Sequence, residues 1–371
     1  MKVLLLSCNT GEGHHSAALA VEAELQSRNI PCQLVDPMSF ASDATRDRVC
    51  NAYNSLIRNL PKAFGLIYKA GEHADGLWPH SPIYLANSLY ADKLLAYIQE
   101  NRFDTVISTH LFGMEAMTAI AKKFGVHIPT YAVLTDYTCI PFFTDVKMDG
   151  YFIPHKDLIP ELTQKGLDAA ILYPTGIPVS PKFAQRLDMT AARERLSLPA
   201  EKKIYLVMTG GAGCGHIGDL CQELREWERE DFLACVLVGK NDKMRDELDA
   251  QFGDDPRICP VGFTREVNVY MNAADVLITK PGGLSSTEAA AACVPLIHLI
   301  TIPGCEEYNA AFYAAHGMSR PTEDPRQAAR LAVELAHDSA ACRNMRLCQQ
   351  REINPYSARD LVDKVLLLEK A

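Results

Sequence analysis

Residues 279–288 read TKPGGLSSTE and join an apolar, strand-like run at Ala274–Ile278 to an alanine-rich helix from Ala289. A glycine-rich turn between a strand and a helix leaves backbone N–H groups without partners, and the helix N-terminus carries about half a positive charge. Gly282 and Gly283 let the backbone approach a ligand closely, because no Cβ stands in the way. The stretch predicts a Rossmann-like strand–turn–helix unit and a candidate site for an anion such as a phosphate.

The same stretch has an alternative interpretation as a capping box. Ser285 and Glu288 have the S-x-x-E spacing that satisfies helix-end donors without any ligand. Ser285, Ser286 and Thr287 could instead donate hydrogen bonds to a phosphate. Glu288 could accept two hydrogen bonds from a ribose diol, as acidic residues near dinucleotide turns do. The segment matches neither the P-loop nor the G-x-G-x-x-G pattern, so the choice between a capping box and a ligand site stays open.

Two related glycine turns follow other strand-like runs. The stretch SCNTGEGHHSAA (7–18) follows VLLL, and TGGAGCGH (209–216), which contains Gly211 and Gly213, follows IYLVM. In the first turn, His14 lies where a helix is expected to begin. An imidazole with an unperturbed pKa near ~6.5 suits proton transfer there, although an exposed or capping histidine is the alternative.

Short apolar runs alternate with helical patterns in both halves of the chain, which predicts parallel sheets covered by helices. The expected strands are Val3–Leu6, Pro31–Val35, Thr105–Thr109, Thr130–Leu134, Gly150–Ile153, Ile171–Tyr173, Ile204–Met208, Ala234–Val238, Arg257–Val261, Val276–Thr279 and Pro295–Leu299. We expect a helix over Ser16–Ser27 and a final helix that begins after Ser357 as its N-cap.

The length of 371 residues exceeds one ordinary domain. The proline-rich stretch PTGIPVSP (174–181) predicts a linker between an N-terminal domain (1–175) and a C-terminal domain (182–350), with the last helix (356–371) able to pack back on the first domain. The fold class is therefore α/β, with two Rossmann-like domains facing across a cleft. Ligands are then expected at the carboxyl ends of the strands.

Composition argues against several classes of protein. The net charge of -9 disfavours a nucleic-acid binder. The twelve cysteines include no C-x-x-C pair, and Cys8, Cys235 and Cys293 lie in apolar runs, so reduced cytosolic thiols are expected. The N-terminus MKVLLLSCN predicts a short strand and not a signal peptide. No stretch approaches the ~20 apolar residues that span a bilayer.

The motifs are more specific together than singly. They are GEGHHSAA near the start, LTDY (134–137), IPHKDL (153–158), PTGIPV (174–179), MTGGAGCG, VLVGKN (236–241), VGF (261–263), ITKPGGLSSTEA (278–289) and IPGCEEYNA (302–310). With them, almost the whole chain resembles the family of processive diacylglycerol glycosyltransferases and monogalactosyldiacylglycerol synthases. The last four motifs, in that order and spacing, are the most specific.

The resemblance implies a GT-B fold, in which the C-terminal domain binds a UDP-sugar, usually UDP-glucose or UDP-galactose, and the N-terminal domain takes a diacylglycerol or related lipid acceptor. It places Phe263 at the uracil and Glu288 at the ribose. It implies that the remaining donor residues are Gly211, Gly213, Gly283, Ser285, Ser286 and Thr287 around the diphosphate, and Glu306, Glu307 and Asn309 at the hexose.

The expected reaction is an inverting hexosyl transfer. His14 and Asp136 of LTDY are the candidates for the base, or for a base and its orienter, and the proton is not assigned to either. A helix N-terminus with hydroxyls can stabilise the UDP leaving group, and no compelling metal cluster is found, so no metal or other cofactor is predicted. Two departures stand out: YTCIPFFTD after LTD lacks the family's histidine and tryptophan, and Cys305 replaces a glutamine.

The region Asn51–Leu95 mixes apolar and aromatic residues with lysines and arginine. It could rest in a bilayer interface, or it could be an ordinary core region of the acceptor domain. With a lipid acceptor, the first interpretation predicts a cytoplasmic protein bound peripherally at the inner face of the cell membrane. The alternatives to lipid glycosylation are a UDP-sugar-dependent transferase with another acceptor and a catalytically weak UDP-sugar sensor.

Overall fold

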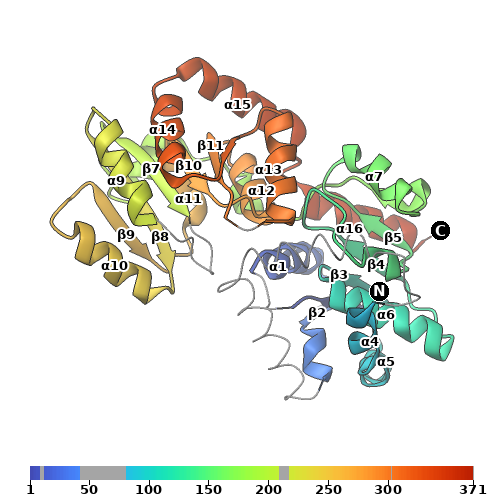
Figure 1. The fold of residues 1–371 in the computed structure, drawn as a ribbon. Coiled ribbons are helices and arrows are strands. Elements are labelled where there is room, and N and C mark those ends of the chain that lie inside the picture. The colour runs from blue at the N-terminus through green and yellow to red at the C-terminus, as the bar shows by residue number, and fades with distance from the viewer. Residues whose placement is uncertain (9–11, 42–80, 209–216, 302, 371) are drawn as a thin grey trace. The chain divides into compact units, whose positions relative to one another are not determined.

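The computed structural model describes residues 1–8, 12–41, 81–208, 217–301 and 303–370 (Figure 1). The chain forms two compact units. One comprises Met1–Ser180 together with Asn354–Ala371, and the other comprises Pro181–Ile353. Each unit has its own parallel sheet with helices on its faces, so each is described by itself.

In the first unit, the described strands form a parallel sheet of six in the order β2-β1-β3-β4-β5-β6. These strands are β1 (Val3–Leu6), β2 (Cys32–Val35), β3 (Thr105–Ser108), β4 (Thr130–Val133), β5 (Gly150–Phe152) and β6 (Leu172–Tyr173). The central strands are fully buried, as expected of a sheet that helices cover on both faces.

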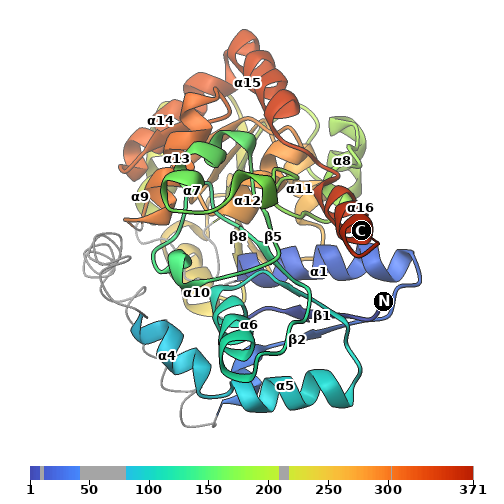
Figure 2. The same ribbon diagram turned by 90° about the vertical axis from the view of Figure 1, so that its right-hand side faces the viewer.

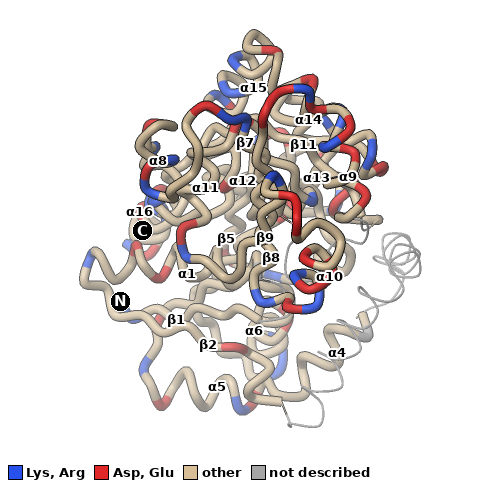
Figure 3. The backbone as a smooth tube through the Cα atoms, turned by 90° about the vertical axis from the view of Figure 1, so that its left-hand side faces the viewer, with Lys and Arg blue, Asp and Glu red and all other residues tan. Residues whose placement is uncertain are grey.

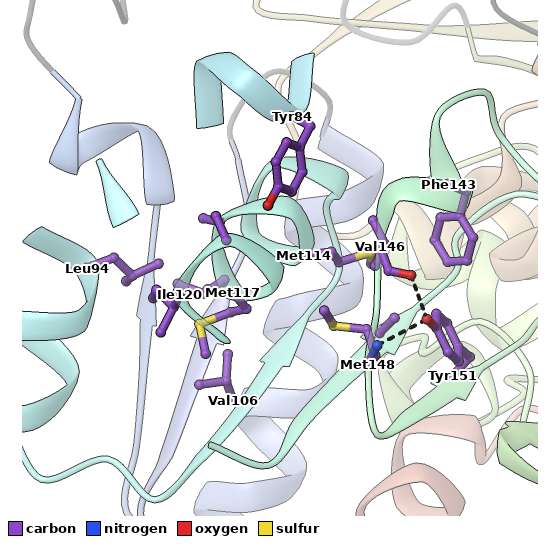
Figure 4. Packing of buried hydrophobic residues seen from close by; sticks show 14 of the residues in the cluster. Tyr84, Leu94, Val106, Met114, Met117, Ile120, Phe143, Val146, Met148 and Tyr151 are labelled. Carbon is purple, nitrogen blue, oxygen red and sulfur yellow. Dashed lines mark hydrogen bonds between the residues drawn. The ribbon is translucent and has the colours of Figure 1, made fainter. Parts of the chain in front are cut away.

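The helices of this unit are α1 (Glu12–Ser27), α4 (Pro82–Ser88), α5 (Ala91–Glu100), α6 (Leu111–Phe124), α7 (Ile159–Gln164) and α16 (Ser357–Leu368), with 3₁₀ turns η1 (Pro37–Phe40), η2 (Phe143–Asp145), η3 (Lys156–Leu158) and η4 (Ala169–Ile171). One core gathers around α6 (Figure 4). In it the Tyr151 hydroxyl donates to the Val146 carbonyl at 3.0 Å and accepts from the Met148 N–H at 3.1 Å, so this buried phenol is satisfied.

The C-terminal helix α16 belongs to the first unit. It packs on α1, and its buried Leu361, Val362 and Val365 join Val3 and Leu5 of β1 in a second core (Figure 2). The chain thus returns from the second unit to cover one face of the first sheet.

In the second unit, the described strands form a parallel sheet of six in the order β12-β11-β10-β7-β8-β9. They are β7 (Lys203–Met208), β8 (Phe232–Gly239), β9 (Ile258–Gly262), β10 (Val276–Thr279), β11 (Leu296–Leu299) and β12 (Arg320–Thr322). The helices are α8 (Met189–Arg195), α9 (Ile217–Trp227), α10 (Asp242–Phe252), α11 (Val267–Ala273), α12 (Gly283–Ala291), α13 (Cys305–Ala315), α14 (Pro325–Ala336) and α15 (Ser339–Glu352), with the 3₁₀ turn η5 (Pro181–Phe183).

Acidic and basic residues are mixed on the helices of this unit. Both signs are interspersed on α9, α10 and α14 (Figure 3). A phosphate backbone binds best to a surface dominated by lysine and arginine. The mixed charge of these helices therefore offers no basic stripe for a nucleic acid.

The strand order of each sheet reverses at one point, beside β1 in the first sheet and beside β7 in the second. In the first sheet β1 has β2 on one side and β3 on the other, and in the second sheet β7 lies between β8 and β10. Ligands of such sheets bind outside the carboxyl ends of the strands at this switch point. The glycine turn that follows β10 leaves the second sheet there, at the same level as the end of β7, because Thr279 pairs with Met208.

The structure differs from the sequence analysis at three places, and it decides between two interpretations at a fourth. Strand β12 was not among the expected strands; it contains Pro321, which a strand tolerates at a sheet edge, where β12 lies. Helix α1 begins at Glu12, four residues before the expected Ser16. Ser357 is not an N-cap: it is the first residue of α16, and its buried hydroxyl donates to the Ile177 carbonyl at 2.6 Å. Of the two interpretations left open for the glycine turn, the capping box at Ser285 is absent, because α12 begins at Gly283 after Gly282.

Candidate active site

His14 lies in the first turn of α1, at the switch point of the first sheet. Its Nδ1 atom is 2.9 Å from the carbonyl oxygen of Thr109, just after β3, and 2.8 Å from the Thr135 hydroxyl, just after β4. The Thr109 hydroxyl donates to the His14 carbonyl at 2.9 Å. The histidine is therefore held by the ends of two strands that neighbour each other in the sheet.

Asp136 follows β4 and lines the same small pocket as His14, Thr109 and Thr135. The pocket has a cavity of about 20 Å³, which is room for about one water molecule. The loop that carries Asp136 is anchored by Glu161 of α7, whose carboxylate accepts from the Thr138 hydroxyl at 3.0 Å and from the Cys139 N–H at 2.8 Å. The two expected catalytic residues are thus brought together within one unit.

His110 is a further residue at this place that the motifs did not indicate. Its ring contacts that of His14 edge to face, with the centroids 4.7 Å apart. Its Nδ1 accepts from the Phe112 N–H at 3.2 Å and so caps α6. Burial, reinforced by the nearby His14, lowers the pKa of His110 well below its ordinary value, so this ring is neutral at physiological pH.

In the second unit, the N-terminus of α12 lies at the switch point and has no side-chain cap. The first N–H groups of a helix have no partner within the helix, so those of Gly283, Leu284 and Ser285 can bind a ligand. Ser285 is half-buried. By contrast, the Ser286 and Thr287 hydroxyls are buried.

The buried hydroxyls of α12 make internal hydrogen bonds. Ser286 Oγ is 2.9 Å from Nε2 of the fully buried His298 of β11, and the other ring nitrogen of His298 is 3.0 Å from Ser319 Oγ. Burial lowers the pKa of His298 to about 3, so the ring is neutral. Thr287 donates to the Gly283 carbonyl at 2.7 Å. The buried side chains hold the turn in position. The first backbone N–H groups of α12 and the Ser285 side chain form its exposed part.

Glu288 is half-buried on the same helix. Burial raises the pKa of its carboxyl to about 8, although the nearby Lys182 acts in the opposite direction. A carboxyl group that is poorly solvated in this way gains from any hydrogen-bond donor that a ligand brings, as a ribose diol would.

The expected hexose residues lie on α13, close to the glycine turn. Glu306 is buried and forms an ion pair with Lys280 at 2.9 Å, and its other oxygen is 3.5 Å from the Thr301 hydroxyl. Asn309 is fully buried and donates to the Pro281 carbonyl at 3.0 Å. Glu307 accepts from the Gly304 N–H at 3.3 Å. Glu306 and Asn309 therefore brace the turn that begins at Lys280.

Lys280 is a candidate that sequence reasoning missed. It stands directly before Pro281-Gly282-Gly283, and its partner Glu306 holds it beside the open end of α12. A lysine immediately before a candidate anion-binding turn was the available signal. The ammonium lies near a helix N-terminus that favours an anion, and the Glu306 carboxylate balances its charge.

Phe263 follows β9 and is 65% exposed, with the Lys240 ammonium 5.4 Å from its ring centroid. A large aromatic ring so exposed is free to stack on a ligand. Gly211 and Gly213 lie outside the described residues, so their expected contact with the diphosphate stays a prediction.

Comparisons with known proteins agree with these features. Residues 14–179 match the model of the monogalactosyldiacylglycerol (MGDG) synthase family. A processive diacylglycerol beta-glucosyltransferase of Staphylococcus saprophyticus is 26% identical over 375 residues, which covers 99% of this chain and 93% of the relative. The chain is similar to these lipid glycosyltransferases over nearly its whole length. The resemblance that the motifs predicted is confirmed.

Two solved structures match the fold of this chain. Acinetobacter baumannii MurG matches with a TM-score of 0.65 at 15% identity, covering 100% of this chain and 99% of MurG. Staphylococcus aureus MnaA, solved with UDP, matches with a TM-score of 0.64 at 14% identity, covering 98% of this chain and 96% of MnaA. The GT-B fold, and with it the α/β class, is confirmed.

The expected membrane-contacting region lies mostly outside the described residues. Its described part contains α4, where Leu85 is 54% exposed, and Leu89, which follows α4 and is 77% exposed. Among the described helices, none combines the length and apolar character that crossing a membrane requires.

Proposed function

We propose that this protein is an inverting glycosyltransferase that moves a hexose from a UDP-sugar to diacylglycerol or a related membrane lipid. One observation carries the proposal. His14 and Asp136, far apart in the sequence, line the same pocket at the carboxyl edge of the first sheet, in a chain that resembles diacylglycerol glucosyltransferases over nearly its whole length.

The first unit supplies the acceptor chemistry. An acceptor hydroxyl must lose its proton as its oxygen attacks the anomeric carbon. His14 and Asp136 together form the proton-accepting pair. Attack from the face opposite UDP inverts the anomeric centre, so an α-linked donor gives a β-linked product.

The second unit supplies the donor chemistry. Negative charge grows on the UDP oxygen as the glycosidic bond breaks, and preorganised dipoles lower its energy. The open N-terminus of α12, the Ser285 hydroxyl and the Lys280 ammonium provide these dipoles and charge. Phe263 stacks on the uracil, and Glu288 accepts hydrogen bonds from the ribose. We expect no requirement for a divalent cation.

The hexose is selected near the start of α13. We propose glucose or galactose as the sugar, bound beside Glu306, Glu307 and Asn309. Cys305 stands where the family has a glutamine, and a thiol cannot replace the paired donor and acceptor of an amide. The hydrogen bonds of this chain to the hexose therefore differ from those of its relatives.

The acceptor lipid requires contact with a bilayer. We propose that the protein binds peripherally at the cytoplasmic face of the cell membrane, and that the exposed Leu85 and Leu89 contribute to this contact. Insertion of these leucines into the bilayer interface would remove their apolar surface from water, which is favourable.

The test is to incubate the protein with a panel of UDP-sugars and vesicles that contain diacylglycerol, and to analyse the lipids by mass spectrometry. We expect a hexosylated lipid from UDP-glucose or UDP-galactose, the same yield in excess EDTA, and loss of product in Asp136→Asn and in His14→Gln. If both donors leave every lipid unmodified, the proposal fails. Tight UDP-sugar binding without turnover would then favour a sensor, and UDP release onto a soluble acceptor would favour a different transferase.

A further inference from the structure

Two oxygen atoms contact the ring of His14 at its Nδ1 side, among the residues that the structure describes. Its Nδ1 is 2.9 Å from the Thr109 carbonyl oxygen and 2.8 Å from Thr135 Oγ1. Both distances are those of ordinary hydrogen bonds. The two oxygens come from the ends of the adjacent strands β3 and β4, whose pairing keeps them in place.

The chemistry of these neighbours decides where the proton of the neutral ring lies. A carbonyl oxygen can only accept, so the contact with Thr109 is a hydrogen bond only if Nδ1 carries a proton. If Nδ1 were unprotonated, its lone pair would face the carbonyl lone pairs at 2.9 Å. With the proton on Nδ1, the Thr135 oxygen serves as a second acceptor.

A neutral imidazole with its proton on Nδ1 has a lone pair on Nε2. We propose that the Thr109 carbonyl and the Thr135 hydroxyl hold His14 in the Nδ1–H tautomer, so that Nε2 is the atom that takes the proton of the acceptor hydroxyl. The catalytic part of this inference rests on the proposed function. Thr135 is then a positioning residue, since it acts through His14.

The step is balanced without any further reactant. The acceptor oxygen forms a bond to the anomeric carbon and its proton moves to Nε2. The bond from that carbon to the UDP oxygen breaks, and its electron pair leaves with UDP. The Nδ1–H stays in place and donates to two oxygens throughout, which stabilises the imidazolium that forms.

The surroundings of His14 preserve this arrangement. The Thr109 hydroxyl donates to the His14 carbonyl at 2.9 Å, so the same residue holds both the backbone and the ring of the histidine. His110 contacts the ring of His14 and accepts the Phe112 N–H through its own Nδ1, which places its proton on Nε2. The neutral His110 does not repel a charged His14.

The tautomer can be read without any turnover. The whole protein, labelled with ¹⁵N and ¹³C in its histidines and deuterated elsewhere, is compared by NMR with the His14→Gln variant to assign the ring signals. We expect a pyrrole-type Nδ1 and a pyridine-type Nε2 for His14 at a pH where the ring is neutral. The opposite pattern, with the proton on Nε2, overturns the inference.

A matched pair of variants tests the role of Thr135. Thr135→Val removes the acceptor oxygen at nearly constant volume, and Thr135→Ser keeps it. We expect kcat to fall about tenfold in the valine variant, the size of one lost hydrogen bond, with KM for the UDP-sugar unchanged. The serine variant should keep kcat within about twofold. The Nδ1–H tautomer should persist in the valine variant, because the Thr109 carbonyl still accepts from Nδ1, so the fall in kcat reports the lost stabilisation of the imidazolium.

The outcomes separate this inference from the proposed function. An Nδ1–H signal in a protein that transfers no hexose refutes the function and leaves the tautomer assignment standing. Hexosyl transfer with an unchanged kcat in a correctly folded Thr135→Val variant refutes the positioning role of Thr135 and leaves the function standing.

Discussion

Adjacent residues of α12 have different roles because a helix turns its side chains in different directions. Ser285 is half-buried in the open first turn, whereas Ser286 is fully buried and hydrogen-bonded to His298. A hydroxyl at the surface can donate to a ligand. A buried hydroxyl that is already bonded maintains the position of the helix instead.

Alanine at each serine should separate these roles. Ser286→Ala leaves a ring nitrogen of His298 without its partner in the core and should lower the free energy of unfolding by ~1–3 kcal/mol. Ser285→Ala should change that free energy by less than ~0.5 kcal/mol and should weaken UDP binding instead. Urea unfolding and calorimetric titration with UDP measure the two effects. Equal losses of stability would contradict the assignment.

Phe263 offers a second test at the scale of single residues. Because its ring is 65% exposed, Phe263→Ala should leave stability almost unchanged. Base stacking is worth ~1–3 kcal/mol, so the affinity for UDP should fall about tenfold. Leu347→Ala, at another residue that is 61% exposed, serves as the control and should bind UDP normally. Normal binding in both variants would remove Phe263 from the site.

At the scale of elements, the packing of α4 against α6 buries a carboxyl group. Glu115 of α6 is fully buried, accepts from the Asn87 amide at 2.5 Å and lies 3.5 Å from the Ser81 hydroxyl. Burial raises the pKa of this carboxyl from its ordinary 4.5 to about 8, more than these hydrogen bonds lower it. The helix pair therefore contains an acid that is neutral at physiological pH.

This acid should make stability depend on pH. Between pH 4.5 and about 8 the unfolded chain ionises Glu115 while the folded chain does not, so its contribution to stability is present at pH 4.5 and is lost as the pH rises through about 8. Glu115→Gln mimics the neutral acid and should be more stable than the parent at pH 8 by on the order of 3 kcal/mol, with little difference at pH 4.5.

Thermal unfolding of both proteins across this pH range checks the prediction. The difference between them is the informative quantity, because the raised pKa of Glu288 gives the parent a similar slope that the variant retains. Parallel curves for the two proteins would show that Glu115 ionises in the folded state.

At the scale of the whole molecule, the chain crosses from the first unit to the second and back. The first unit is completed by Asn354–Ala371, whose helix α16 covers one face of the sheet. Leu361, Val362 and Val365 are fully buried there. The stability of the first unit therefore depends on residues that follow the second unit in the sequence.

Leu361→Ala should destabilise the first unit selectively. Truncation of a buried leucine costs ~2–5 kcal/mol, because a cavity replaces its contacts. Hydrogen exchange followed by mass spectrometry should show faster exchange in β1 and α1 and unchanged exchange in β7 and β10. Leu367→Ala, at a residue of α16 that is 61% exposed, is the matched control. Equal acceleration in both sheets would show that the two units unfold together.

Local patterns sufficed to predict much of this architecture. The strands Val3–Leu6 and Val276–Thr279 have the expected bounds, and the other expected strands differ by one or two residues at one or both ends. Apolar runs and glycine turns act over a few residues, so a sequence records them directly. The motifs likewise sufficed to predict the family, because each is a short stretch of sequence. Strand β12 and the first turn of α1 were not predicted, and β12 contains a proline that only an edge strand tolerates.

Only the tertiary structure decided which side chains meet. The strand order brings Thr109 and Thr135 to Nδ1 of His14, joins Lys280 to Glu306, and turns Ser286 inward to His298. The same nonlocal packing directs the Ser357 hydroxyl to the Ile177 carbonyl, so this hydroxyl does not cap its own helix. Contacts between distant segments depend on how strands pair and helices pack, and no short stretch of sequence contains that information.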